Sequence, residues 1–409
     1  MNILRAGIFH TPRNAFQESN ALDAYADGAL VVDNGRIAAC GDYAVIARNY
    51  PNAETRDLRP GYLLPGFVDT HTHYPQTRII GGLGLELLDW LEQFTLPEES
   101  RLSDAAYAQA LAREFITGLA SHGTTTALVF GSHFAPATAC LFEEAKRRGL
   151  RIYSGLVFGD RHLRPELQQT PEAGYKAAKA LIARFPNYVI TPRFAFSCSQ
   201  DMLDMCGTLL REHPGLLFTT HINESAREIE EVRRLFPWAE DYLAVYDNYD
   251  LIGDDSILAH NVHPGDSELE LLAEREASIA HCPCSNAALG SGIFPMHRHL
   301  EKGVHFALGT DVAAGTGFGM LKETLQAYLL QRLAADPITL SPAQMLYLAT
   351  RAGAEALKLD DEIGDFCPGK SADYVYVRGS FSGLAALLTL AGPSCIGEVR
   401  VHDHVVFAG

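Results

Sequence analysis

Histidine and acidic side chains recur along the chain at a spacing that suits a metal ion. His71 and His73 stand two residues apart at the end of an apolar run. In an extended strand, residues two apart point to the same side, so both imidazoles can reach one ion. His221 and Asp311 complete a set of nitrogen and carboxylate ligands that leaves one position for water, as catalytic zinc sites do. We therefore predict a metal site.

A metal held in this way lowers the pKa of water from about 16 to about 7, which makes hydroxide available at neutral pH. Glu224 follows His221 by three residues, and we expect it to act as general base and then to pass its proton to a substrate nitrogen. We expect Asp311 to orient the hydroxide and His260 to stabilise the developing charge. For His281, both a direct role in the chemistry and a structural role remain open.

Other catalytic signatures are missing. The chain has no Gly-x-Ser-x-Gly, no phosphate-binding loop that ends in Gly-Lys-Ser, and no His-Glu-x-x-His. It also lacks the His-x-Glu and Pro-Cys-x-x-Cys strings of the other zinc deaminases. These absences disfavour serine hydrolases, P-loop enzymes and two other zinc enzyme classes.

Strand-like and helix-like segments alternate through the middle of the chain. We expect helices over 105–122, 170–185 and 225–236, and strands that end near 73 or cover 124–130, 151–158, 188–196, 217–221, 256–260, 277–281 and 305–311. Eight strands that alternate with helices predict an α/β fold, a (β/α)8 TIM barrel. The histidines and Asp311 fall at the C-terminal ends of their strands, where barrel enzymes carry their chemistry.

The two chain ends are rich in β-forming residues. Residues 29–40 suggest a hairpin around Asn34-Gly35, and residues 372–377 and 397–407 also have the composition of strands. We expect both ends to form one small β-sandwich domain from residues 1–64 and 355–409, with the catalytic barrel at 65–354.

Composition narrows the class of protein. Of 409 residues, 47% are hydrophobic and 20% are charged, which is ordinary for a soluble globular chain. A formal net charge of −17 disfavours binding to nucleic acid. The first residues lack the long apolar stretch of a signal peptide, and no later segment has about 18 uninterrupted apolar residues, so we expect neither a signal peptide nor a membrane span. The eight scattered cysteines do not suggest a disulfide framework, so we expect a cytoplasmic location and read Cys282 and Cys284 as core or loop residues.

Longer strings resemble the amidohydrolase superfamily and, within it, the guanine deaminases. They are Pro65-Gly-Phe-Val-Asp-Thr-His-Thr-His-Tyr-Pro-Gln-Thr77, Leu88-Asp-Trp-Leu91, Thr191-Pro-Arg-Phe-Ala-Phe-Ser-Cys198, His221-Ile-Asn-Glu224, Ala280-His-Cys-Pro283 with Ser285-Asn286, and Leu308-Gly-Thr-Asp-Val312. The resemblance implies hydrolysis of guanine to xanthine and ammonia, and a homodimer. Because the strand over 188–196 has no lysine to bridge two ions, it also implies one divalent metal per chain, which we expect to be Zn²⁺.

The resemblance also implies a substrate site. Gln76 and Arg193 would bind the polar edge of the purine, and Phe194 would stack on its ring. Structural explanations remain for each: a loop cap for Gln76, a salt bridge for Arg193 and core packing for Phe194. Helical spacing favours packing for Trp90 as well.

The chain departs from the usual pattern of that family at five positions beside the expected pocket, Cys284, Ala287, Ala288, Ala313 and Ala314. Another purine, a pterin or a triazine therefore stays open as the substrate. A catalytically silent binding or scaffold protein is the non-enzymatic alternative.

Overall fold

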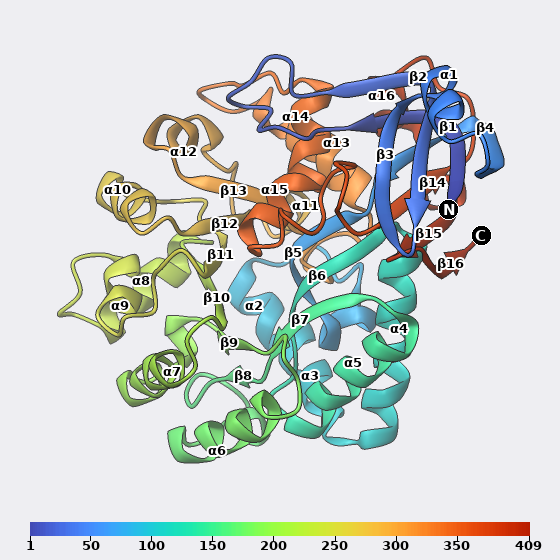
Figure 1. Cartoon of the computed structure of the whole chain (residues 1–409). Coiled ribbons are helices and arrows are strands. Elements are labelled where there is room, and N and C mark those ends of the chain that lie inside the picture. Colours follow the sequence, from blue (N-terminus) through green and yellow to red (C-terminus); the bar gives the residue numbers. More distant parts are fainter.

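A barrel of parallel strands forms the centre of the computed structural model, which describes residues 1–409 (Figure 1). Its strands are β5 (Phe67–His73), β6 (Thr124–Phe130), β7 (Arg151–Gly155) continued by β8 (Val157–Phe158), β9 (Val189–Pro192), β10 (Leu217–Ile222), β11 (Ser256–His260), β12 (Ser278–His281) and β13 (His305–Leu308). They pair as β5-β6-β7 and as β8 to β13 in order. A bridge between Ser154 and Tyr188 joins the two groups, and Asp311 donates its N–H to the His71 carbonyl at 2.8 Å where the barrel closes. The predicted TIM barrel is confirmed.

Helices surround the barrel. The longer ones are α4 (Ala105–Ser121), α5 (Ala135–Arg148), α6 (Pro171–Ile182), α7 (Gln200–Glu212), α8 (Ala226–Leu235), α10 (Asp266–Glu274), α12 (Met296–Lys302), α13 (Met320–Gln331) and α14 (Pro342–Ala349). In α4, the Asp104 side chain caps the first turn, and Leu111, Phe115 and Leu119 recur every four residues on the buried side. The helices predicted over 105–122, 170–185 and 225–236 are thus present as α4, α6 and α8.

Short helices follow several strands. They are η1 (Tyr74–Ile79), α2 (Leu87–Trp90), η2 (Leu91–Thr95), α3 (Leu96–Ser100), η3 (Arg101–Ser103), η4 (Pro165–Leu167), η5 (Ala195–Ser197), α9 (Tyr242–Asp247), α11 (Pro283–Ala288) and α15 (Arg351–Ala356). The run from η1 to α3 lies between β5 and α4, so it leaves the C-terminal end of the first barrel strand. This run and α11 supply the parts of the site that the strands do not.

Both chain ends contribute to one seven-stranded sheet, in the order β16-β15-β14-β4-β1-β2-β3. Its strands are β1 (Asn2–His10), β2 (Asp23–Asp33), β3 (Arg36–Asp42), β4 (Glu54–Pro65), β14 (Tyr374–Val377), β15 (Ile396–Val401) and β16 (His404–Ala408), with helices α1 (Tyr43–Asn49), α16 (Leu384–Leu390) and η6 (Pro393–Cys395) beside them. Asn34 and Gly35 have φ angles of 49° and 77°, as the predicted hairpin requires. The stretch over 397–407 is itself a hairpin, because His402 and Asp403 turn the chain.

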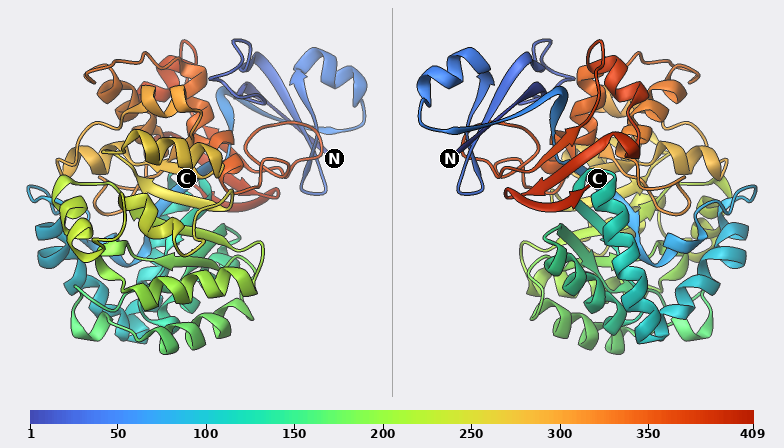
Figure 2. Two further views of the ribbon diagram at one scale, coloured as in Figure 1. Left: turned by 90° about the vertical axis from the view of Figure 1, so that its left-hand side faces the viewer. Right: turned by 90° about the vertical axis from the view of Figure 1, so that its right-hand side faces the viewer.

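Figure 2 shows the N-terminal strands standing to one side of the barrel. The sheet passes directly into the barrel, since only Gly66 separates β4 from β5. A Cβ at Gly66 would lie 2.2 Å from Thr125 Oγ1 of β6, so only glycine fits there. The boundaries at residues 64 and 355 remain a prediction.

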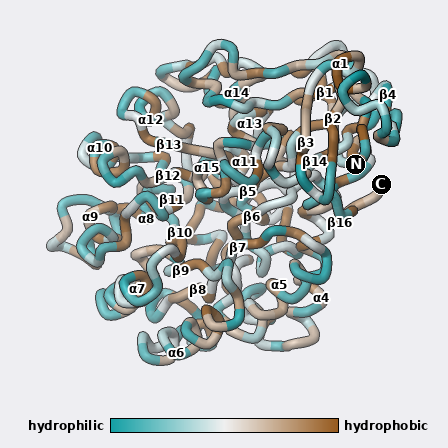
Figure 3. The backbone as a smooth tube through the Cα atoms, in the orientation of Figure 1, coloured by the Kyte–Doolittle hydropathy of each residue, from teal (hydrophilic) through white to brown (hydrophobic).

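The barrel strands are closed off from solvent. Every residue of β5 and β6 is buried, as expected for parallel strands that are covered on both faces. In Figure 3 the outer helices α7, α9 and α10 carry many hydrophilic residues. None of the helices combines the length and apolar composition needed to cross a membrane.

Candidate active site

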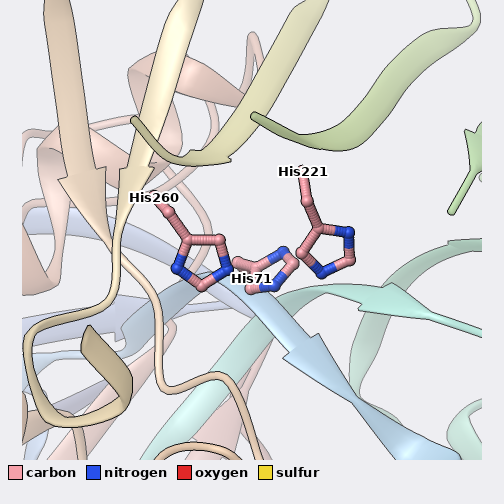
Figure 4. Close-up of side chains that lie close together, drawn as sticks. All are labelled: His71, His221 and His260. Carbon is pink, nitrogen blue, oxygen red and sulfur yellow. The ribbon is translucent and has the colours of Figure 1, made fainter. Parts of the chain in front are cut away.

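The predicted metal ligands meet at the C-terminal end of the barrel. His71 and His73 lie in β5, His221 lies in β10, and Asp311 follows β13. Figure 4 shows the rings of His71 and His221 close together, with His260 of β11 beside them. Strand geometry therefore collects residues that are far apart in the sequence.

Four ligand atoms converge on one point. His73 Nε2 lies 3.2 Å from His71 Nε2, 3.2 Å from His221 Nε2 and 3.2 Å from Asp311 Oδ1. His71 Nε2 lies 3.3 Å from the same Asp311 oxygen. Ligands at zinc distances of about 2.1 Å in a tetrahedron would be about 3.4 Å apart, so the spacing fits a metal ion.

The hydrogen bonds of the imidazoles support this fit. His221 Nδ1 lies 2.6 Å from the Arg193 carbonyl oxygen, so Nδ1 carries the proton and Nε2 presents a lone pair. Burial lowers the pKa of His71 to about 3 and holds the pKa of His221 well below its usual value, so both rings are neutral at pH 7. Neutral imidazole nitrogens facing one another repel unless a cation lies between them, and the donor set therefore fits a divalent metal.

Glu224 and His260 lie beside the ligands. His260 Nε2 is 3.5 Å from Glu224 Oε2 and 3.9 Å from Asp311 Oδ2. Burial, together with Asp311 and Glu228, raises the pKa of Glu224 well above its usual value. A carboxyl group with a raised pKa binds a proton more readily than an ordinary one, which suits general acid and base chemistry. His260 also groups with His71 and His221 as a possible metal ligand.

A segment around α11 contacts the side chains of Asp311, His260 and Glu224. Ser285 Oγ donates to Asp311 Oδ2 at 2.5 Å, His260 Nδ1 lies 3.0 Å from Asn286 Oδ1, and Ser291 Oγ lies 3.5 Å from Glu224 Oε1. Ser285-Asn286 belongs to one of the strings that carry the family resemblance, but its spacing gives no hint of these contacts. Sequence reasoning therefore missed its part in the site.

The backbone at the strand ends is unusual. Asn223, His260, Asn261 and Asp311 have positive φ angles of 49°, 76°, 45° and 46°. Such conformations are uncommon for residues other than glycine and gather at functional sites, where the surrounding structure holds them. Two of the four are residues with predicted roles in the chemistry.

His281 lies apart from this cluster. It ends β12, is buried, and stacks on Phe294 with ring centroids 4.3 Å apart. Neither of its ring nitrogens has a hydrogen-bond partner, and the ring does not line the cavity. This placement favours the structural reading of His281.

The predicted substrate residues lie across the same cavity. Gln76 lies in η1, and Arg193 and Phe194 directly follow β9, which ends at Pro192 rather than at 196. The three side chains are buried at 1%, 3% and 4% exposure. Arg193 Nη1 donates to Glu99 Oε2 of α3 at 2.6 Å, and Gln76 Nε2 donates to Glu99 Oε1 at 2.9 Å. Sequence reasoning did not identify Glu99.

One cavity connects both groups of residues. Its lining consists of His73, Gln76, Leu87, Trp90, Leu91, Arg193, Phe194, His221, Glu224, His260, Leu289, Asp311 and Ala314. Trp90 packs, as predicted, but it also forms part of the wall with Leu87 and Leu91. Of the five departures from the family pattern only Ala314 lines the cavity, and Ala313 contacts Gln76 Oε1 through its N–H at 3.4 Å.

Comparison with known proteins identifies the family. The sequence profile of the amidohydrolase family matches residues 62–399. The chain belongs to the amidohydrolase family. A second profile, an imidazolonepropionase-like composite domain of bacteria, matches residues 28–53, which precede the amidohydrolase match.

Individual amidohydrolases are similar over nearly the whole chain. A probable guanine deaminase of Deinococcus radiodurans is 53% identical over 100% of this chain and 99% of its own length. The solved structure of Escherichia coli guanine deaminase has a TM-score of 0.95 and 36% identity, with both chains covered fully. A guanine deaminase of C. acetobutylicum with guanine bound in its active site has a TM-score of 0.92 and 26% identity, over 99% of this chain and all of that one.

Proposed function

We propose that this protein is a metal-dependent guanine deaminase, which converts guanine and water to xanthine and ammonia. One observation carries the proposal: a single cavity is lined by His73, His221 and Asp311 on one side and by Gln76, Arg193 and Phe194 on the other. When bound, the divalent metal lowers the pKa of water and so supplies a nucleophile at neutral pH. The similarity to guanine deaminases along nearly the whole chain supports guanine as the substrate.

The acidic groups of the chain move the protons. Glu224 accepts a proton from the attacking water as the oxygen bonds to C2 of the purine ring. It then gives that proton to a ring nitrogen beside C2, and the new hydroxyl group at C2 passes its remaining proton to the amine. The bond from C2 to the amine breaks, and ammonia leaves as the C2 carbonyl of xanthine forms. Asp311 holds the water in line through its oxygen, and His260 stabilises the charge that develops between Glu224 and Asp311.

The other side of the cavity binds the ring. Arg193 can only donate hydrogen bonds, which suits a purine carbonyl, and Gln76 can both donate and accept. Phe194 presents an aromatic ring to a flat heterocycle. Burial of these side chains strengthens each contact, because water does not compete there.

We infer that the metal is zinc and that each chain holds one ion. Three imidazole nitrogens and one carboxylate oxygen are ligands that zinc prefers, and they leave room for a water. Metal analysis of the purified protein tests this inference. About one zinc per chain would support it, and a stoichiometric content of iron or another metal would overturn the assignment of zinc.

The first experiment measures ammonia release from guanine, adenine, cytosine, a pterin and a triazine by the purified protein of known metal content. We expect release from guanine alone, with xanthine as the second product. Release of ammonia from another ring would support hydrolytic deamination but overturn guanine as the substrate. Silence on every compound with metal bound would overturn the deaminase assignment.

We also infer a homodimer in the cytoplasm. The eight free cysteines suit a reducing compartment. Leu329 of α13 and Leu333 just beyond it are 46% and 75% exposed, and an apolar surface of this kind suits a contact with a second copy. Light scattering during size exclusion should give the mass of two chains. Replacing Leu333 with Glu should shift the mass towards one chain, and a wild-type monomer would overturn the inference.

A further inference from the structure

Glu99 is a buried carboxylate directly behind the substrate side of the cavity. It lies in α3 and is 3% exposed. One oxygen accepts from Gln76 Nε2 at 2.9 Å, and the other accepts from Arg193 Nη1 at 2.6 Å. His133 Nε2 lies 3.4 Å from that second oxygen. Glu99 does not line the cavity, so it acts only through the residues that do.

The charge state of Glu99 decides what it can bind. Burial opposes its ionisation, but Arg193 and His133 outweigh burial and hold the pKa of Glu99 below its usual range. An ionised carboxylate accepts hydrogen bonds and cannot donate them. Both oxygens of Glu99 therefore require N–H donors, which Gln76 and Arg193 supply.

The Glu99 carboxylate, which can only accept hydrogen bonds, fixes the orientation of the Gln76 carboxamide. Its Nε2 must face Glu99, and its Oε1 faces the N–H of Ala313 at 3.4 Å. A flipped amide would set oxygen against carboxylate and N–H against N–H. The end of Gln76 that the ligand meets is therefore decided by Glu99 and Ala313, on opposite sides of the amide.

Glu99 also balances the charge of Arg193. No other carboxylate lies within 4 Å of the Arg193 guanidinium, and the side chain is 4% exposed. An unpaired buried charge is strongly unfavourable, so Arg193 keeps one nitrogen on Glu99 and leaves its other N–H groups for a ligand. A single residue thus sets both polar groups that face the ring.

We propose that Glu99 is the positioning residue that makes the cavity selective for a ring edge with a carbonyl beside an N–H, as in a 6-oxopurine. This inference rests on the proposed function and deepens it. Arg193 donates to the carbonyl, and Gln76, held in one orientation, meets the neighbouring ring atoms. A ring without that carbonyl leaves the buried Arg193 donors unpaired, which weakens its binding.

Binding of compounds that cannot be deaminated tests the inference without relying on turnover. Hypoxanthine has the 6-oxo edge but no amine at C2, and purine has neither. We expect calorimetry to show that the wild-type protein binds hypoxanthine at least about tenfold more tightly than purine, as loss of a hydrogen bond to a charged group predicts. An equal affinity for both compounds would overturn the inference.

Two variants and a matched control complete the test. Glu99→Gln puts an N–H group against Gln76 or Arg193, and Glu99→Asp keeps the charge but is one methylene too short to reach both. Each should lower the preference for hypoxanthine by about tenfold with metal content unchanged. If Glu99→Gln does not fold, Glu99→Asp still tests the inference, because its carboxylate keeps the negative charge that compensates Arg193.

Glu98→Gln is the control, since the neighbouring Glu98 is also buried but bonds Arg101 and Tyr107. Its preference for hypoxanthine should equal that of the wild type. A full preference in Glu99→Asp, or an equal loss in Glu98→Gln, would overturn the role of Glu99. A wild-type protein that binds as expected but releases no ammonia from guanine would overturn the proposed function and leave this inference standing.

Discussion

The two sides of the cavity are built differently. On the reaction side, His71, His73 and His221 project from barrel strands, so the main chain itself fixes where their nitrogens meet. On the recognition side, Gln76 and Arg193 lie on a short helix and a loop, and a carboxylate from a third segment ties them together. The first side depends on strand geometry and the second depends on side chains that hold one another.

This difference has an energetic consequence. The reaction side is supported by a different side chain for each group, among them Ser285 on Asp311 and Asn286 on His260. The recognition side concentrates its support in Glu99, whose contacts with Gln76 and Arg193 share one carboxylate. Changes on the reaction side should therefore alter turnover, and changes on the recognition side should alter which ring is bound.

The largest effect should come from Glu224→Gln on the reaction side. Gln cannot accept the proton from water, so kcat for guanine should fall by about 10²- to 10⁴-fold. Metal content and hypoxanthine affinity should stay near wild-type values, because no metal ligand is removed and Gln keeps the size and shape of Glu. Ammonia release, metal analysis and calorimetry measure the three quantities.

Glu230→Gln is the matched control. Glu230 is an exposed residue of α8, so this variant should keep full activity. Wild-type turnover in Glu224→Gln would remove Glu224 from the chemistry. A loss of hypoxanthine affinity instead would mean that the two sides of the cavity are not separate.

The next effect should come from Arg193→Ala on the recognition side. The change removes a donor to the ring and leaves Glu99 buried without its cation. We expect kcat/KM for guanine to fall by about 100-fold, or about 2.7 kcal/mol, as for a hydrogen bond to a charged group. The His221 contact with the carbonyl of residue 193 uses the main chain, so the metal should stay bound.

Arg184→Ala provides the comparison, because Arg184 is exposed and pairs with Glu143 of α5 outside the cavity. Its kinetic constants should match those of the wild type. An unchanged kcat/KM in Arg193→Ala would take Arg193 out of substrate binding.

The sequence predicts the two sides unequally. A period of two in a strand aligns His71 with His73, and the barrel pattern places His221, His260 and Asp311 at one end, so the reaction side follows from local rules. The strands over 124–130 and 256–260 agree with the structure residue for residue. By contrast, the strand expected over 188–196 ends at Pro192, which leaves Arg193 and Phe194 in a loop.

The role of Glu99 could not be predicted from the sequence, for a physical reason. In Pro97-Glu-Glu-Ser100 it looks like one of two acidic residues in the first turn of an exposed helix. Hydrogen bonds from Gln76 of η1 and from Arg193 after β9 hold Glu99 inward, while Glu98 pairs with Arg101. That choice depends on contacts between segments far apart in the sequence, which no local pattern encodes.

A moderate effect should come from Ser285→Ala. Its hydroxyl donates to the Asp311 oxygen that does not face His71 and His73, so its loss should loosen Asp311 without removing a ligand. We expect about a tenfold fall in kcat or in metal affinity, as for other groups that orient a ligand. Hypoxanthine preference should not change.

A metal titration followed by kinetics at saturating metal separates the two possibilities for Ser285. Ser267→Ala, which removes an exposed hydroxyl near Asp241, is the control. If Ser285→Ala matched the wild type in both measurements, Asp311 would be held by the barrel alone.

The smallest effect should come from Cys284→Thr, at one of the five positions where the chain departs from the usual pattern of the family. Cys284 is buried but does not line the cavity, and its N–H donates to Glu323 Oε2 at 3.0 Å. Burial raises the pKa of Glu323 to about 8, so a protonated carboxyl is available to bond the new hydroxyl. We expect kcat/KM for guanine and the preference for hypoxanthine to stay within about twofold of the wild type. A larger change in the preference would mean that α11 shapes ring recognition as well as the reaction, and the division between the two sides would have to be redrawn.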